Sequence, residues 1–236
     1  IRDQPRSRGL EMCIRDRSFD LQELEIAETR LESASAHRSR LLLAIEAGGR
    51  EVVCTPEHVL LGVRDGRIEL VPAGEVGVGD VLVGVTRVRA RSRRESSISL
   101  DTWRLAGFCA GCGERDGDRV MLIHRDGGIL ETYADLASRM DIESHWEGSS
   151  LVLEHRFLLE FAGADKLPQS IFCASEREVE HFLLGFSDAV GRDLGGFLVL
   201  ESESRELLKD VQALYLYSGI QSRLRSRGER VELVVA

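Results

Sequence analysis

The chain has 236 residues, with 31 Lys and Arg against 40 Asp and Glu and a formal net charge of -9. Its composition of 43% hydrophobic and 30% charged residues excludes a disordered chain, and no apolar run approaches the ~18 residues of a membrane span. Five scattered cysteines do not form a disulfide framework, so we expect a reducing, cytoplasmic setting. The negative balance argues against a strong non-specific nucleic-acid binder, because phosphate affinity comes mainly from Lys and Arg.

Residues 1–20 differ from the rest of the chain. Pro5 and Gly9 break the first part, and residues 11–17 show neither a helical nor a strand period. They resemble translated sequencing adapter at the ends of assembled metagenomic reads, and they contain no secretory signal. We therefore expect residues 1–20 to be an artefact or disordered.

Residues 21–92 are predicted to form a β-rich domain. Its turns are indicated by Gly48-Gly49 and Asp65-Gly66. The predicted strands cover residues 41–45, 51–54, 59–63, 68–71 and 81–88. A charged, Ser-rich stretch at residues 89–99 follows and indicates a domain boundary.

Residues 95–236 are predicted to form an α+β domain of two pseudo-repeats, near 100–170 and 175–236, offset by about 78 residues. Capping boxes are indicated at Thr132 and at Ser175. The predicted helices cover residues 100–111, 132–140, 157–161, 175–186 and 207–215, the strands 119–124 and 197–200, and the hairpins 141–154 and 220–235.

Each pseudo-repeat begins with a helix that carries small residues four positions apart. Gly107 and Gly111 lie on one face of the first helix, and Gly185 and Ala189 lie on one face of the second. Two such faces can pack at a short axial distance, which brings the helix ends together.

Residues 105–113 and 183–191 both resemble the nine-residue LAGLIDADG motif of DOD-type homing endonucleases. The resemblance implies a duplicated αββαββα domain that binds double-stranded DNA. It also implies one carboxylate per helix end for Mg²⁺, which activates water against a phosphodiester.

The eighth motif position, where the family has its metal-binding acid, is Cys112 in one copy and Val190 in the other. Neither is an oxygen ligand, so we expect no metal or cofactor site and no DNA cleavage. Asp188 is about 200° around the helix from Val190, and we expect it to form a salt bridge or to lie at the helix end. The nearby acids Glu114, Asp116 and Asp193 are predicted to lie in loops.

Thr55 and His58 lie in a second recognisable block. Residues 49–58 and 73–81 resemble segments of the Hint-type splicing domain of inteins. The spacing Thr-x-x-His alone favours a structural turn, but its place before a duplicated endonuclease unit favours the intein interpretation. The resemblance implies that Thr55 and His58 polarise a scissile peptide, and that host-protein exteins are partners.

Two further expectations concern splicing and quaternary structure. Because residues 231–236 contain no His-Asn pair and Cys13 lies in the adapter-like string, we expect an internal fragment that does not splice. We also expect a monomeric pseudo-dimer with no membrane partner.

Two alternatives remain open. Cys109-x-x-Cys112 is compatible with zinc or redox chemistry, but the missing second ligand pair favours two buried thiols. The endonuclease-like domain could also be a catalytically dead module retained for binding DNA. Residues 92–236 have 17 basic and 25 acidic residues, a net charge of -8, which predicts weak DNA binding.

Overall fold

In the computed structural model of the chain, the described residues are 15–20, 25–30, 40–88, 96–228 and 230–235. The first element is an antiparallel hairpin of β1 (Arg15–Asp20) and β2 (Glu25–Arg30). Strand β1 lies inside the segment expected to be an artefact or disordered, and it forms without an apolar period because backbone pairing in a ladder does not require one. Residues 1–14, including Cys13, lie outside the described part.

Residues 43–82 form two small sheets. One is a hairpin that turns at Gly48 and Gly49, which have φ angles of 59° and 77°. The other has the strand order β6-β5-β7. The elements are β3 (Leu43–Ala47), β4 (Arg50–Cys54), β5 (Val59–Arg64), β6 (Arg67–Pro72), the 3-10 turn η2 (Ala73–Glu75) and β7 (Val81–Leu82).

The strand predicted over residues 81–88 ends at Leu82. Beyond it, carbonyl groups accept hydrogen bonds from side chains rather than from a neighbouring strand. Val85 O accepts from Arg50 Nη1 at 2.8 Å, and Thr86 O accepts from Gln221 Nε2 at 2.8 Å. The backbone is thus satisfied without a ladder. Of the predicted boundary at 89–99, residues 89–95 lie outside the described part.

Residues 100–172 have the element order αββαββα. Their four strands form one antiparallel sheet with the order β10-β11-β9-β8. The elements are α1 (Leu100–Cys112), β8 (Gly113–Asp116), β9 (Arg119–Leu122), α2 (Gly127–Arg139), β10 (Glu143–Glu147), β11 (Ser150–Glu154), the 3-10 turn η3 (Leu158–Glu160) and α3 (Gln169–Phe172).

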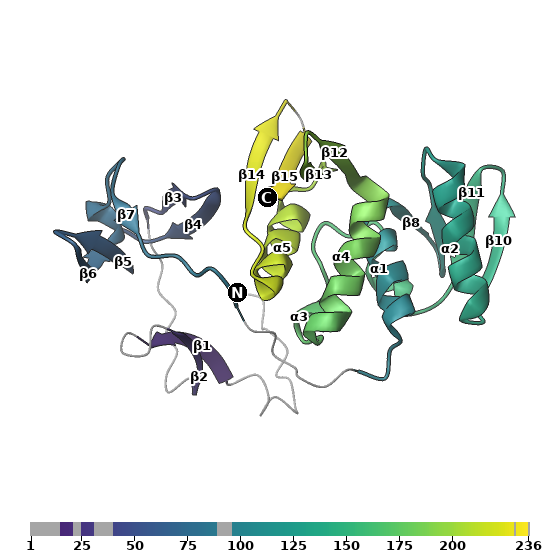
Figure 1. Cartoon of the computed structure of the whole chain (residues 1–236), viewed down its shortest axis with the longest axis horizontal. Helices are drawn as coiled ribbons and strands as arrows, with labels where there is room; N and C mark the ends of the chain where they lie inside the picture. Colours follow the sequence, from purple (N-terminus) through teal and green to yellow (C-terminus); the bar gives the residue numbers. More distant parts are fainter. Residues whose placement is uncertain (1–14, 21–24, 31–39, 89–95, 229, 236) are drawn as a thin grey trace.

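Residues 176–235 repeat the order αββαββ. Their sheet has the order β12-β13-β15-β14, which is that of the first sheet counted from the opposite edge. The elements are α4 (Glu176–Val190), β12 (Gly191–Leu194), β13 (Phe197–Ser202), α5 (Arg205–Tyr215), the 3-10 turn η4 (Leu216–Ser218), β14 (Ser222–Arg227) and β15 (Arg230–Val235). Figure 1 shows α1 and α4 side by side between the two halves.

Two local predictions in these halves are corrected. The helix predicted to start at Thr132 starts at Gly127, because the Asp126 side chain accepts a hydrogen bond from Gly128 N at 2.9 Å and caps it. The short strands β8 and β12 were not predicted, because each has four mostly polar residues directly after a helix. The capping box at Ser175 is confirmed.

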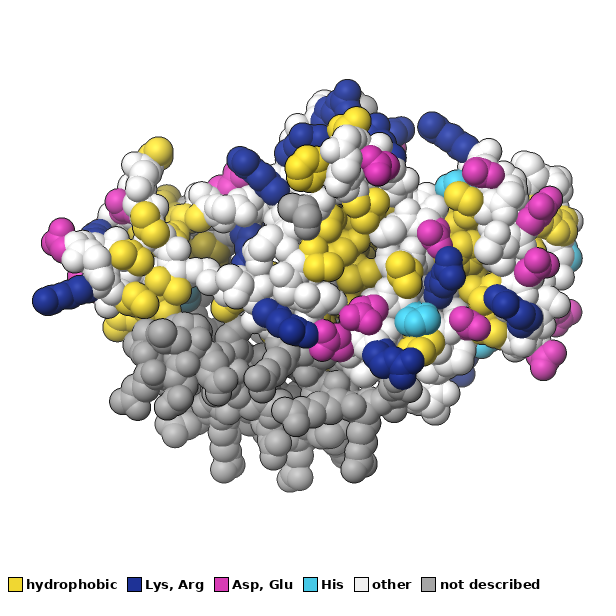
Figure 2. Space-filling view, viewed as in Figure 1, with side chains coloured by type: hydrophobic (Ala, Val, Ile, Leu, Met, Phe, Trp, Pro, Cys, Tyr) yellow, Lys and Arg dark blue, Asp and Glu magenta, His cyan; other side chains and the backbone are white. Residues whose placement is uncertain are grey.

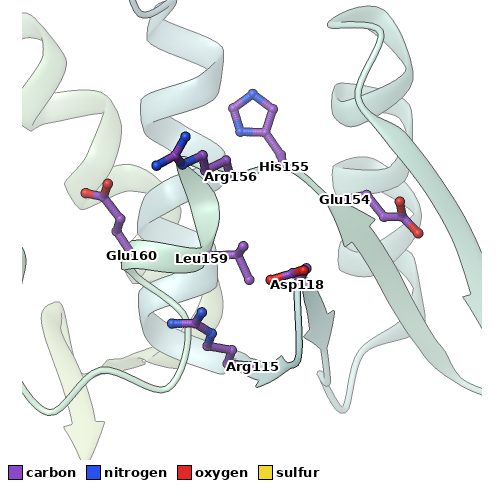
Figure 3. Close-up of a pocket in the computed structure, with 7 residues that line it drawn as sticks. All are labelled: Arg115, Asp118, Glu154, His155, Arg156, Leu159 and Glu160. Carbon is purple, nitrogen blue, oxygen red and sulfur yellow. The ribbon is translucent and has the colours of Figure 1, made fainter.

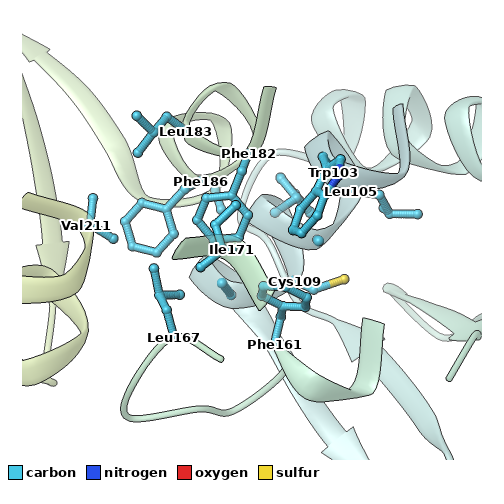
Figure 4. Close-up of a cluster of buried hydrophobic side chains, with 14 of the residues drawn as sticks. Trp103, Leu105, Cys109, Phe161, Leu167, Ile171, Phe182, Leu183, Phe186 and Val211 are labelled. Carbon is cyan, nitrogen blue, oxygen red and sulfur yellow. The ribbon is translucent and has the colours of Figure 1, made fainter. Parts of the chain in front are cut away.

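One hydrophobic core joins the two halves. Its centre contains Phe161, Phe182 and Phe186, and Figure 4 shows their rings close to Trp103 and Ile171. The small sheets of residues 43–82 contribute little burial. Their buried hydrophobic residues are Cys54, Val71 and Ala73, while Figure 2 shows apolar side chains on the surface of this region.

The β3–β4 hairpin contacts the second half. Gly49 O accepts from Gln212 Nε2 at 3.1 Å and from Leu224 N at 3.4 Å. Lys209 Nζ lies 2.9 Å from Glu51 Oε1. In the described part of the chain, no helix has the length and apolar character needed to span a bilayer.

Candidate functional site

The site predicted from sequence is built on the contact between α1 and α4. A Cβ atom at Gly107 would overlap the carbonyl oxygen of Phe182, and one at Gly185 would overlap that of Arg104. The two contacts are reciprocal, since each glycine is the third residue of its motif and each carbonyl lies three residues before a motif glycine. The helices therefore touch backbone to backbone.

The last turns of the two helices also meet. A Cβ atom added at Gly111 would lie 2.5 Å from Ala189 Cβ and 3.2 Å from Val190 Cγ1. Cys112 and Val190 are both half-buried against the core, and Cys112 Sγ contacts Phe108 O at 3.5 Å. The two eighth positions of the motif thus provide a thiol and an isopropyl group, not carboxylates, at the junction of the helix ends.

Asp188, the sixth residue of the second motif, joins three helices. Arg104 Nη2 of α1 donates to its Oδ2 at 2.8 Å, and Tyr133 Oη of α2 donates to the same oxygen at 2.7 Å. The bond to Asp188 raises the pKa of Arg104, and burial together with Asp188 raises that of Tyr133 well above its usual range. The predicted salt bridge is present, and it links Asp188 of α4 to Arg104 of α1.

The other acids near the motifs lie in strands, so their prediction as loop residues is wrong. Glu114 and Asp116 are exposed in β8, and Asp116 pairs with Arg119 at 2.5 Å. Asp193 lies in β12 and accepts a hydrogen bond from Gly196 N at 3.0 Å. Among the described residues, no group of three or more His, Cys, Asp or Glu side chains is arranged to hold a metal ion.

Cys109 and Cys112 are free thiols in α1. Burial raises the pKa of Cys109 well above its ordinary value and raises that of Cys112 to about 12. Buried, protonated thiols are poor nucleophiles and poor metal ligands. This geometry favours packing over the zinc or redox interpretation.

Thr55 and His58 lie in the connection between β4 and β5. His58 N donates to Thr55 O at 3.0 Å, which closes a turn, and Ala73 N donates to His58 O at 2.7 Å. Thr55 is half-buried and His58 is exposed. The backbone thus brings the two residues into one turn.

A surface hollow of about 510 Å³ lies at the end of the first sheet, as Figure 3 shows. His155 Nδ1 is buried there without a hydrogen-bond partner among the described residues, and burial lowers the pKa of this imidazole. The other lining residues are Arg115, Asp118, Glu154, Arg156, Leu159 and Glu160. Two arginines oppose three carboxylates, so the hollow offers no charge preference for an anion.

The sequence prediction missed a group of arginines on the second sheet. Arg223, Arg225 and Arg227 alternate along β14 and therefore project from one face. The strand register places Arg192 of β12 and Arg230 of β15 on the same face of the sheet. The alternation within 222–227 was a visible signal, but the contribution of β12 was not, because that strand was not predicted.

The chain matches no protein-family model. It is 26% identical over 215 residues to a reverse gyrase of Pyrococcus horikoshii, and the match covers 75% of this chain and 13% of that protein. The chain therefore spans only a small part of the length of this relative.

Two solved structures match part of the chain. I-DmoI in complex with DNA and Mn has a TM-score of 0.43 and 15% identity, covering 58% of this chain and 89% of that one. The N-terminal LAGLIDADG domain of DUF199/WhiA has a TM-score of 0.46 and 13% identity, covering 63% of this chain and 89% of that one.

Proposed function

We propose that residues 100–235 form a DNA-binding domain of the homing-endonuclease type that does not cleave DNA, and that this domain belongs to an intein. The reciprocal contact of Gly107 and Gly185 carries the proposal. It reproduces, from this chain's own residues, the helix pairing that the sequence motifs imply. It also brings together the two helix ends at which a nuclease of this type would need its acids.

The residues at that junction do not fit a divalent metal. Mg²⁺ is bound through oxygen ligands, and neither Val190 nor the half-buried Cys112 thiol, whose pKa is raised to about 12, supplies one. Asp188 is engaged by Arg104 and Tyr133 on another side of the helix. We therefore derive no metal-dependent step for this chain.

Restoring the two acids tests this proposal. The full chain with Cys112→Asp and Val190→Asp should gain Mn²⁺ binding by calorimetry, while the native chain and a Cys112→Ser, Val190→Ala control should show none. The native chain should shift a random-sequence DNA duplex on a gel at low salt and should not cut a plasmid library with Mg²⁺. Mg²⁺-dependent cutting by the native chain, abolished by Asp188→Ala or Asp193→Ala, would overturn the proposal.

The splicing part rests on the turn that joins Thr55 to His58 and on the surface of the small sheets. Val53, Val59 and Leu70 are at least half exposed. Such apolar exposure is expected of a β-unit that packs against further protein. We propose that Thr55 and His58 act on an upstream peptide bond in a precursor with host-protein exteins, in the cytoplasm.

A precursor expressed from the complete reading frame tests this second part. His58→Ala should reduce cleavage at the upstream junction relative to an Arg64→Ala control at the end of the following strand β5, as seen by gel and mass spectrometry. Equal cleavage in the two variants would leave the alternative, a DNA-binding module with no role in splicing.

A further inference from the structure

We infer that double-stranded DNA contacts this protein through only one of its two four-stranded sheets, by the arginine face of β12–β15. This inference rests on the proposed DNA-binding function and specifies its contact surface. The arginine face is defined as the residues that project from the second sheet on the side away from α5.

The strand register determines which side chains belong to the arginine face. Val231, Leu233 and Val235 of β15 are buried toward α5, so the residues between them project outward. The outward charged residues of the sheet are Arg192, Glu201, Arg223, Arg225, Arg227, Arg230 and Glu232. Five arginines and two glutamates leave an excess of three positive charges on this face.

A buried carboxylate organises the centre of the arginine face. Glu232 is 0% exposed, and its oxygens lie 2.7 Å from Arg192 Nη2, 2.5 Å from Arg225 Nε and 3.2 Å from Arg227 Nη1. A second carboxylate, Glu201, lies 2.5 Å from Arg192 Nη2. Guanidinium groups that are already held in place lose less side-chain entropy when they bind phosphate. This arrangement therefore favours contact with the phosphate backbone of DNA.

The guanidinium groups nevertheless stay accessible. The side chains of Arg225, Arg227 and Arg230 are 50%, 68% and 55% exposed. Figure 2 shows Lys and Arg side chains gathered over the tip of β14 and β15. Each guanidinium has five N–H donors, so pairing with Glu232 leaves donors free for phosphate oxygens.

The corresponding face of the first sheet has the opposite charge. Val120, Leu122, Leu151 and Leu153 are buried toward the helices, so the alternate residues project outward. The outward charged residues are Glu114, Asp116, Arg119, Glu143, Glu147 and Glu154. Five carboxylates and one arginine leave an excess of four negative charges.

The single arginine on this acidic face is already paired. Arg119 donates to Asp116 at 2.5 Å and to Glu147 at 2.9 Å. A DNA duplex placed across both sheets would meet attraction on one side and repulsion on the other. One-sided contact is therefore the favoured geometry.

The size of the contact follows from the sheet. Four strands about 4.8 Å apart, and six residues at about 3.4 Å each, give a surface of roughly 15–20 Å in either direction. With phosphates about 3.4 Å apart along each strand, that span covers about 4–6 base pairs. Contact by both sheets would cover at least twice as many.

The test compares matched charge variants of the full chain. Arg223→Gln with Arg230→Gln removes two positive charges and leaves the ion pairs of Glu232 intact. Glu143→Gln with Glu154→Gln is the matched control on the acidic face. Binding to one random-sequence 30-base-pair duplex is measured over a range of salt concentrations, together with hydroxyl-radical footprints on the best-bound duplex of a selected library.

We expect the arginine variant to lower the slope of log affinity against log salt by about 2 and to weaken binding at least about tenfold. The Glu143→Gln, Glu154→Gln control should bind as tightly as the native chain or tighter, and the footprint of the native chain should cover about 4–6 base pairs. Together these results would support one-sided contact.

Other outcomes separate the two levels of the proposal. If the native chain binds no duplex at low salt, the proposed DNA-binding function itself fails. If it binds but the arginine variant changes nothing, or the footprint is twice as long, one-sided contact is wrong while DNA binding stands. If sedimentation shows that the native chain is a dimer and that both variants are monomers, the arginine face of one copy binds the acidic face of another copy instead of DNA.

Discussion

The substitution Gly107→Ala addresses the contact on which the fold and the proposed function depend. A Cβ atom at this position would lie closer than 3.0 Å to the Phe182 carbonyl oxygen, a separation that real Cβ atoms essentially never show. The obstructing atom belongs to the backbone of α4, so no rotamer change can relieve the overlap. The Cβ atom would lie 1.9 Å from that oxygen, so reaching an ordinary C···O distance of about 3.3–3.6 Å requires the helices to separate locally by roughly 1.5 Å.

That separation loosens the surrounding core. A radial gap of about 0.5–1 Å forfeits a quarter to a half of the dispersion energy of each contact it opens. Phe182 and Phe186 are fully buried at this interface, so many contacts are affected. We expect a loss of about 3 kcal/mol in the free energy of unfolding, the upper end of the usual overpacking penalty. For a chain of this size the melting temperature should fall by about 6–12 °C.

Urea denaturation followed by circular dichroism measures this loss. The matched control is Gly127→Ala, because Gly127 is also helical, as the first residue of α2, but a Cβ atom there meets nothing within 4 Å. The control should be neutral or stabilising by up to about 1 kcal/mol, since alanine restricts the unfolded chain. If the two variants differ by less than about 0.5 kcal/mol, the backbone contact between α1 and α4 does not exist as described.

Three further changes test other parts of the molecule. Asp188→Asn should lower the free energy of unfolding by about 1 kcal/mol through weakened helix-bridging hydrogen bonds, whereas the exposed control Asp135→Asn should change it by less than about 0.5 kcal/mol in urea. Equal effects would contradict the bridging role. In the native chain a thiol reagent should label exposed Cys173 and spare Cys109, whose pKa is raised by burial, and peptide mass spectrometry detects the difference. Labelling of Cys109 at the same rate would contradict its burial. Burial alone would raise the pKa of Glu232, but its arginine partners bring it below the ordinary 4.5. Its stabilising contribution is therefore complete above the unfolded pKa and is lost as the pH falls through the lower folded pKa. Glu232→Gln should remove that part of the pH dependence of the melting temperature.

The helix pair could be predicted from sequence because its determinants are local. Gly107 and Gly185 are each followed four residues later by another small residue, and a helix turns that spacing into a face. Hairpins with Gly turns were predicted for the same reason. The turn at Gly48 and Gly49 has the positive φ angles that such a sequence favours.

The charge arrangement could not be predicted, because it depends on which strands become neighbours. Glu232 of β15 pairs with Arg225 on the neighbouring strand β14. It also pairs with Arg192 on β12, which lies two strands away in the sheet and 40 residues away in sequence. The short strand β12 provides Arg192, and its polar sequence after α4 gave no strand period. Asp188 was predicted to form a salt bridge, but its partners on α1 and α2 follow only from the tertiary fold.

The net charge of -8 over residues 92–236 conceals two sheet faces of opposite sign, one with Glu143 and Glu154 and the other with Arg223 and Arg230. The two sheets are held apart by α1 and α4, whose axes in a close pair lie about 8–10 Å apart, with α2 and α5 beyond them. At physiological ionic strength the screening length is about 8 Å, so a phosphate on the arginine face is affected little by the distant carboxylates. Lower salt extends their repulsion as well as the attraction of the arginines. The acidic sheet therefore does not prevent DNA contact; it restricts which side of the protein can make it.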